Sequence, residues 1–230
     1  MATKTYLQLV NEVLIRLRED QVASVAESTY SILVGAWVND AKRMVEDSWD
    51  WQALQTNVQV NIVASTQTYA LSSLNERARL LRDVNCPKFP LAFDTTSGDP
   101  FQLVDAPLDW IRTQRTLLAA NPSNQAKPIY FAVSKTAGGM QVDLYEVPTA
   151  SRTWTFYFVD PQDDLSADSD ILSVPYAPVV QIALDYALSE RGEEIGEPGT
   201  TVEQKALIHI GNAVAIDSQD QPHRTTFTPG

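Results

Sequence analysis

The clearest pattern of hydrophobic and polar positions runs over residues 26–51, AESTYSILVGAWVNDAKRMVEDSWDW. Apolar residues recur there at steps of three and four, the spacing of one face of a long amphipathic helix. The residues on this face are Tyr30, Val34, Trp37, Val38, Ala41, Val45 and Trp49. The pattern ends at Trp49 and Trp51, where a β pattern begins. We therefore expect the rest of the chain to pack around this helix.

A shorter helix is predicted before it, over residues 3–19. Thr5-Tyr-Leu-Gln8 has the form of a capping box, in which the hydroxyl and the amide each bond a backbone N–H. A second box, Ser24-Val-Ala-Glu27, is expected to open the long helix. Because the connection is short, the two helices should be antiparallel neighbours.

The period changes to two after residue 57, which indicates strands. Val58, Val60 and Ile62 alternate with polar residues, and Trp154, Phe156 and Phe158 do the same near the end of the region. Further strands are predicted at 68–71, 80–84, 89–93, 129–134 and 140–147, with one short helix over about 106–119. The region should be mainly antiparallel and form a small sandwich or barrel-like sheet.

Helical patterns return after an acidic stretch, residues 160–174, which we interpret as a solvated linker. Pro175 and Pro178 open a third helix, and a capping box at Thr200 opens a fourth. From Asp217 the chain is polar and without a period, so we expect an unstructured tail.

The fold class predicted is therefore α+β. The N-terminal and C-terminal helix pairs are expected to form a four-helix bundle, with a mainly antiparallel β domain inserted between its halves. The predicted boundaries are 1–56 for the first half of the bundle, 57–169 for the β-rich insertion, 170–216 for the second half and 217–230 for the flexible tail.

Charge argues against a nucleic-acid-binding protein. The 230 residues have a net charge of −12, and residues 161–230 carry 12 acidic but only 3 basic side chains. Phosphate contacts need Lys and Arg, so non-specific DNA binding is not expected. A single cysteine excludes an intrachain disulfide framework. No apolar run approaches the ~20 residues that span a bilayer, so we expect a soluble protein made in the cytoplasm.

The sequence contains no recognisable motif for catalysis or metal binding. His209 and His223 have no partner at metal-ligand spacing. The acidic linker resembles a calcium loop only superficially, because Leu165 and Ile171 occupy the positions that need glycine and glutamate. There is no phosphate-binding glycine loop and no serine elbow. The sequence therefore predicts no catalytic residue, no cofactor and no metal, and a protein that is not an enzyme.

Three features together resemble one family. The first is the pair of N-terminal helices that ends in Ser48-Trp49-Asp50-Trp51 and runs directly into a strand. The second is Trp154-Thr-Phe-Tyr-Phe-Val-Asp160-Pro with its acidic spacer. The third is Asp170-Ile-Leu-Ser-Val-Pro175-Tyr-Ala-Pro-Val-Val and the Ala-rich helix that follows, up to Ser189-Glu-Arg191. This resembles the head-to-tail adaptor (connector) proteins of tailed bacteriophages, including the tail tubular protein A of short-tailed phages.

The resemblance implies a structural virion protein. Subunits would form a ring, typically a dodecamer, below the portal, extending the DNA channel and docking the nozzle or other tail proteins. The protein would be assembled in the host cytoplasm and lie in the neck between capsid portal and tail. DNA would pass through without specific binding, past the acidic residues. The C-terminal segment would contact the portal through His223, Arg224 and Phe227; the alternative is a plain frayed terminus.

The residues by themselves are also compatible with two other functions. The aromatic residues could form a sugar platform, which would suit a carbohydrate-binding or depolymerising tail protein, although core packing is favoured. These aromatics are Trp49, Trp51, Trp110, Trp154, Tyr157 and Phe158. An adaptor predicts that Trp110 and Trp154 are buried, whereas a tail enzyme predicts an exposed aromatic groove with two carboxylates ~5–9 Å apart. A cytoplasmic scaffold or chaperone is the third possibility.

Overall fold

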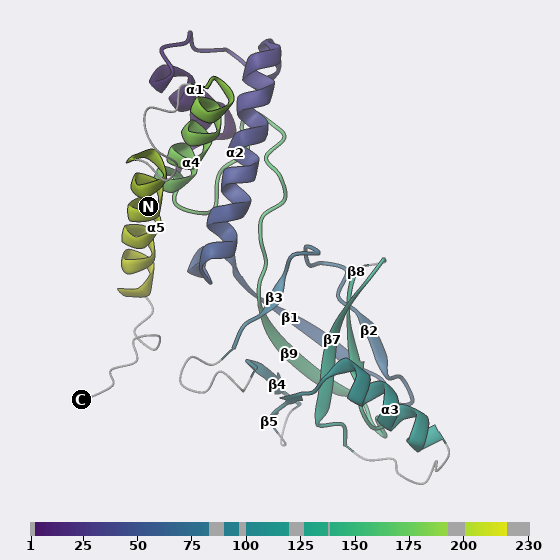
Figure 1. Cartoon of the computed structure of the whole chain (residues 1–230). Helices are drawn as coiled ribbons and strands as arrows, with labels where there is room; N and C mark the ends of the chain where they lie inside the picture. Colours follow the sequence, from purple (N-terminus) through teal and green to yellow (C-terminus); the bar gives the residue numbers. More distant parts are fainter. Residues whose placement is uncertain are drawn as a thin grey trace, which may run out of the picture. The chain divides into compact units, whose positions relative to one another are not determined.

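The structure, a computed structural model, describes residues 3–82, 90–96, 100–119, 127–137, 139–192 and 201–219. These residues form two compact units. One is helical and combines residues 3–54 with the described part of 162–219; the other is β-rich and lies within 55–161. The predicted α+β class is confirmed (Figure 1).

The helical unit contains four of the α-helices found among the described residues. They are α1 (Tyr6–Arg16), α2 (Thr29–Ser48), α4 (Tyr176–Glu190) and α5 (Thr201–Gln219), with short 3-10 helices η1 (Val25–Glu27) and η2 (Gln52–Leu54). The Thr5–Gln8 capping box is present, with the Thr5 N–H donating to Gln8 Oε1 at 3.1 Å. The second box was placed wrongly: Ser24 caps η1, and α2 begins with a box formed by Ser28 and Ser31.

Helix α2 has a fully buried face, as its pattern predicted, but α4 and not α2 packs against all the other α-helices of this unit. Val34, Val38, Ala41 and Val45 have no exposed surface. Helix α4 packs against α1, α2 and α5, and α1 also packs against α2 (Figure 1). Gly35 permits close approach, because a Cβ there would lie 2.3 Å from the Tyr6 hydroxyl oxygen.

The β unit is built from two sheets. In strand order, the first contains β1 (Gln55–Ile62), β9 (Arg152–Val159), β4 (Ala92–Asp94) and β5 (Phe101–Gln102), with β3 (Arg79–Leu80) also paired to β9. The second contains β2 (Thr68–Ala70), β8 (Gly139–Leu144), β7 (Tyr130–Thr136) and β6 (Val104–Asp105). The pairs are antiparallel except β6 with β7, which are parallel. Helix α3 (Leu108–Ala119) packs on β7 and β8, close to the predicted 106–119.

One hydrophobic core is shared by the two sheets. Ile62 and Phe156 come from the first sheet, and Phe131 and Val142 come from the second; all four are fully buried. Alternation along β1 and β9 explains this, because successive side chains of a strand point to opposite faces. Val60 is the partner of Trp154 in the register of these two strands.

Two expectations about chain connections need correction. Residues 162–169 belong to the helical unit, eight residues earlier than the predicted boundary, because their backbone is bonded to α2. The predicted tail begins too early, because α5 continues to Gln219 and Asp217 is only 5% exposed. The polar character of Asp217 predicted a tail. In the structure its carboxylate accepts a hydrogen bond from Trp49, at the end of α2.

Candidate interaction surface of the helical unit

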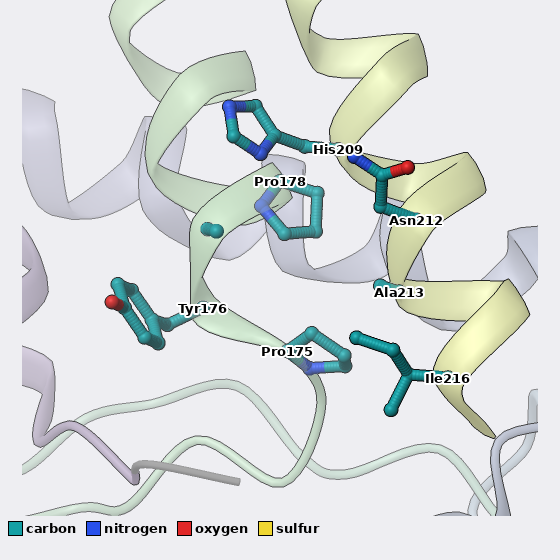
Figure 2. A pocket seen from close by; sticks show the side chains of 8 residues that line it. Pro175, Tyr176, Pro178, His209, Asn212, Ala213 and Ile216 are labelled. Atoms are coloured by element: carbon teal, nitrogen blue, oxygen red, sulfur yellow. The ribbon is translucent and has the colours of Figure 1, made fainter.

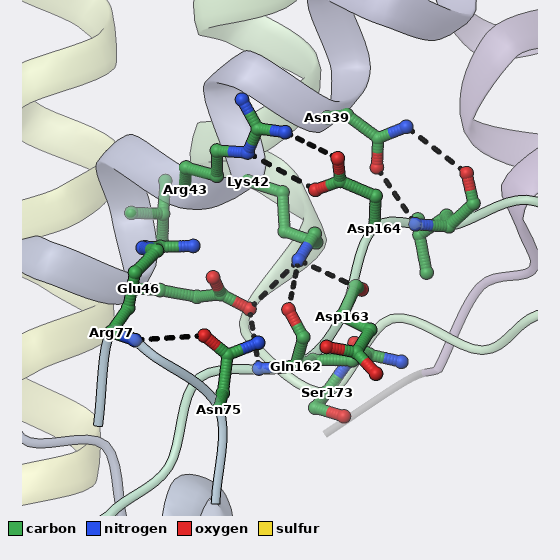
Figure 3. A network of polar contacts seen from close by, with 12 residues as sticks. Asn39, Lys42, Arg43, Glu46, Asn75, Arg77, Gln162, Asp163, Asp164 and Ser173 are labelled. Carbon is green, nitrogen blue, oxygen red and sulfur yellow. Dashed lines mark hydrogen bonds and ion pairs between the residues drawn. The ribbon is translucent and has the colours of Figure 1, made fainter. Parts of the chain in front are cut away.

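The acidic stretch is hydrogen-bonded to two residues of α2 that form a buried ion pair with each other. Lys42 and Glu46 lie one turn apart, both side chains have no exposed surface, and Lys42 Nζ is 3.1 Å from Glu46 Oε1. Lys42 also donates to the backbone carbonyls of Gln162 at 2.6 Å and Asp163 at 3.1 Å, and Glu46 accepts the Gln162 N–H (Figure 3). The stretch is therefore an integral part of the helical unit and not a solvated linker.

Further contacts fix the same stretch along its length. Asn39 exchanges two hydrogen bonds with the backbone of Leu165, at 2.9 and 3.0 Å (Figure 3). Arg43 forms an ion pair with Asp164 on the surface. Asp168 accepts the Val25 N–H at 3.0 Å. These bonds connect α2, η1 and the acidic stretch.

The residues that suggested calcium have other roles. Asp160 accepts the Asn75 N–H, and Gln162 donates to the Ile171 carbonyl. The backbone N–H groups of Ser166 and Ala167 bond Asp170, which lowers the pKa of that carboxyl. Within the described ranges, no group of three or more His, Cys, Asp or Glu is arranged to hold a metal ion.

The ends of α2 and α5 are joined by a buried carboxylate. Trp49 Nε1–H donates to Asp217 Oδ2 at 3.0 Å, and the Gln52 N–H lies 3.4 Å from the same carboxylate. Trp51 is 1% exposed, and its Nε1–H donates to the Val45 carbonyl at 2.7 Å. Both tryptophans therefore serve the structure of the helical unit.

An apolar groove of about 270 Å³ lies between the start of α4 and the side of α5 (Figure 2). Pro175, Tyr176 and Pro178 form one wall. His209, Ala213 and Ile216 form the other, and His209 is exposed on α5. The predicted surface position of His209 is confirmed, and the groove gives it apolar neighbours.

The outer surface of α5 continues this apolar character. Leu207, Ile208 and Ile216 are 59%, 60% and 55% exposed, whereas Ala206 and Ala213 are buried. A helix that is hydrophobic all round is normally covered on every side. The sequence carried this signal: residues 206–216 contain no Asp, Glu, Lys or Arg, and their apolar positions follow no single face. Within this chain, therefore, α5 exposes an apolar face suited to contact with another protein.

The aromatic residues divide between core and surface. Trp154 and Phe158 are fully buried in the β unit, as expected, but Tyr157 is 38% exposed. The expectation that Trp110 is buried was wrong, because it is 37% exposed on α3. Trp110 packs edge-on against Tyr130 and Tyr145, with ring centroids 5.3 and 5.0 Å away.

The predicted portal-contact residues lie outside the described residues. They are His223, Arg224 and Phe227. Their proposed role therefore stays a prediction. None of the helices in the described ranges is both long and apolar enough to cross a bilayer.

A helical unit assembled from both ends of the chain, with an exposed apolar helix, defines a protein suited to act through protein contacts. The sequence matches the SU10 adaptor protein family over residues 4–226, which is nearly its whole length. The chain belongs to this family, and the resemblance to bacteriophage head-to-tail adaptors is confirmed. Membership makes it a virion protein that contacts other virion proteins. Comparison with curated proteins gave no match.

Proposed function

We propose that this chain is a non-enzymatic head-to-tail adaptor, similar in role to the tail tubular protein A of short-tailed phages. Its copies form a ring, by resemblance a dodecamer, that lies below the portal in the virion neck. The ring extends the DNA channel for ejection and docks the tail nozzle or other tail components. The observation that carries this proposal is the adaptor-family match over residues 4–226.

The architecture of the helical unit supports the proposed bundle with an inserted β unit. In the proposal, the N-terminal pair α1 and α2 and the C-terminal pair α4 and α5 are the two halves of a four-helix bundle, and the β unit is its insertion. The contacts of α4 with α1, α2 and α5 support this assignment. So does the backbone bridge between Thr5 and Ile171, which joins the two halves.

Acidic residues would keep DNA from binding the ring. Residues 161–230 carry most of the net charge, and like charges repel the phosphate backbone. Several of these acids are used in structural bonds, including Asp164, Asp168 and Asp170. The channel lining would therefore come from the remaining acids. Imaging that places the acidic residues on the outer rim would contradict this part of the proposal.

The C-terminal segment is the proposed portal contact. His223, Arg224 and Phe227 would supply two groups that can carry positive charge and one large apolar anchor. Polar segments without a periodic pattern commonly become ordered when they bind a partner protein.

The experiment is to mix the purified chain with portal rings and image the complexes. Rings of this protein on the portal are expected, and their absence would contradict the proposal. The truncated control should lack residues 220–230, since a cut at 217 would also remove buried Asp217. If the truncated chain no longer binds the portal, the proposed C-terminal contact is supported. If it binds as well as the full chain, that contact is contradicted.

A second candidate function rests on the exposed rings of Trp110 and Tyr130, which pack together with the half-buried Tyr145. Clustered aromatic faces can bind sugars by stacking, as a carbohydrate-binding or depolymerising tail protein would require. Titration with phage-receptor polysaccharides would quench the fluorescence of Trp110 if this function is present. An identical response from Trp110→Phe would argue against it.

A further inference from the structure

A second exposed apolar surface lies on α2, in the same helical unit as the outer face of α5. On the first half of α2, Ile32 and Leu33 are 53% and 37% exposed, and Ala36 is exposed beside them. Steps of three and four place these residues on one side of the helix. We refer to them as the α2 strip, and to Leu207, Ile208 and Ile216 as the α5 strip.

The two strips belong to different sides of the helical unit. Helix α4 packs against α2 and against α5 and lies between them (Figure 1). The residues of α2 that face inward, such as Val34 and Val38, are fully buried, and the α2 strip is turned away from them. On α5, Ala206 and Ala213 are buried, whereas the three residues of the α5 strip are exposed. A single subunit therefore presents one apolar strip on each side of α4.

Charge favours a second copy of this chain as the occupant. With a net charge of −12, two copies repel each other except where their contact excludes charge. Residues 206–216 contain no carboxylate and no Lys or Arg, and the α2 strip has none either. These strips are therefore surfaces where two acidic copies can meet without bringing like charges together.

Shape also favours this pairing. Ile32 lines a hollow of about 450 Å³ together with Val25 and Leu165, and its lining also includes polar residues, among them Asp168, whose carboxylate accepts the Val25 N–H. On α5, Gly211 has open space where a Cβ would be placed, so another helix can approach closely there. Large side chains of one strip thus have space to pack on the other.

We propose that the α5 strip of one subunit packs on the α2 strip of the next. Such a contact uses two different surfaces, and repeated contacts of this kind close into a ring when the rotation between subunits allows it. The inference rests on the proposed ring and identifies its subunit interface. It differs from a two-fold contact, in which each copy would present the same strip.

The test uses two single variants, Ile208→Asp in the α5 strip and Leu33→Asp in the α2 strip. Association is measured by sedimentation velocity over a range of concentrations, both alone and with portal rings. Each variant alone should weaken self-association about tenfold or more, because each contact needs one intact strip of each kind. Val63→Asp is the matched control, since Val63 is 53% exposed but belongs to the β unit. Circular dichroism and thermal melting check that the variants are folded.

Mixing the two variants separates the possible geometries. A mixture contains one intact α2 strip and one intact α5 strip on different chains, so the proposal predicts dimers that grow no further. A two-fold contact through either strip alone would leave one variant able to dimerise by itself. That result, or a mixture without dimers, would overturn the proposal.

The outcomes also distinguish this inference from the proposed function. Portal rings that recruit wild-type and Ile208→Asp chains into equal rings would overturn the interface but keep the adaptor function. Self-association that the two variants abolish, without any portal binding by the wild type, would keep the interface and overturn the function. A wild-type chain that does neither overturns both.

Discussion

The indole N–H of Trp49 donates to the carboxylate of Asp217 at 3.0 Å, so the end of α2 is bonded to the end of α5. The two residues are separated by 168 positions in the sequence. Asp217 is 5% exposed, and a buried carboxylate must be bonded to be tolerated. This pair therefore fixes the helix that carries the α5 strip.

Trp49→Phe tests this link. It removes the N–H donor and keeps an aromatic ring, so the buried Asp217 carboxylate loses the hydrogen bond from the indole. We expect the free energy of unfolding to fall by about 1–3 kcal/mol and amide exchange in the last turns of α5 to rise. The control is Ser218→Ala, one residue along the helix, which should change either quantity little. Equal exchange in the wild type and Trp49→Phe would show that the bond does not hold α5.

Lys42→Met tests the buried pair with Glu46. The substitution leaves a carboxylate with no exposed surface and without its cation, which should lower the free energy of unfolding by about 3–5 kcal/mol. Arg43→Ala is the control, because its ion pair with Asp164 is exposed and should contribute less than about 1 kcal/mol. Chemical denaturation of both variants measures the difference. Similar losses for the two would contradict the structural role assigned to Lys42.

Two glycine substitutions should have opposite effects. Gly35→Ala places a Cβ 2.3 Å from the Tyr6 hydroxyl oxygen and 3.0 Å from Val25 Cγ1, so we expect a loss of about 1–3 kcal/mol. Gly211→Ala meets nothing within 4 Å and should gain about 0.5–1 kcal/mol from better helix propensity. Thermal melting of the isolated chain measures both. A gain at Gly35 would show that α1 and α2 do not pack as closely as described.

Asp143 should make the β unit sensitive to acid. Burial acts to raise its pKa, but hydrogen bonds from Ser134, Thr68, Arg115 and Gln141 outweigh burial and hold the pKa below its usual value. A lowered pKa in the folded state stabilises the protein fully above the unfolded value of about 3.9, and this contribution is lost as the pH falls through the folded pKa.

Asp143→Asn should therefore lower the free energy of unfolding by about 1–3 kcal/mol at pH 7. The difference from the wild type should shrink below about pH 4, where the Asp143 carboxyl of the unfolded chain begins to be protonated before that of the folded protein. Denaturation at a series of pH values measures this. A difference that stays constant down to pH 3 would contradict the assignment.

Local patterns predicted most of the secondary structure. The steps of three and four in α2 and the alternation in β9 report directly which side of an element is buried. The α5 strip was not recognised as a contact surface, because apolar residues lie on several sides of this helix and not only on the side expected to face inward. Leu207 and Ile208 thus look like core residues until the neighbours of α5 are known.

Contacts between distant residues were the main source of error. The acidic stretch was interpreted as a linker because Asp163 and Asp164 are hydrophilic, and nothing nearby in sequence shows that Lys42 binds its backbone. Asp217 was assigned to a tail for the same reason. The adaptor interpretation placed Trp110 in the core, but edge-on packing against two tyrosines allows one side of the ring to remain exposed.

The most direct test of the central claim is the position of the protein in the assembled phage particle. Cryo-electron microscopy of the neck, with averaging that does not impose a ring size, measures it. The adaptor function predicts a ring of density directly below the portal that fits the helical unit and the β unit. Density for this chain at a tail fibre or spike, or its absence from the particle, would contradict the account.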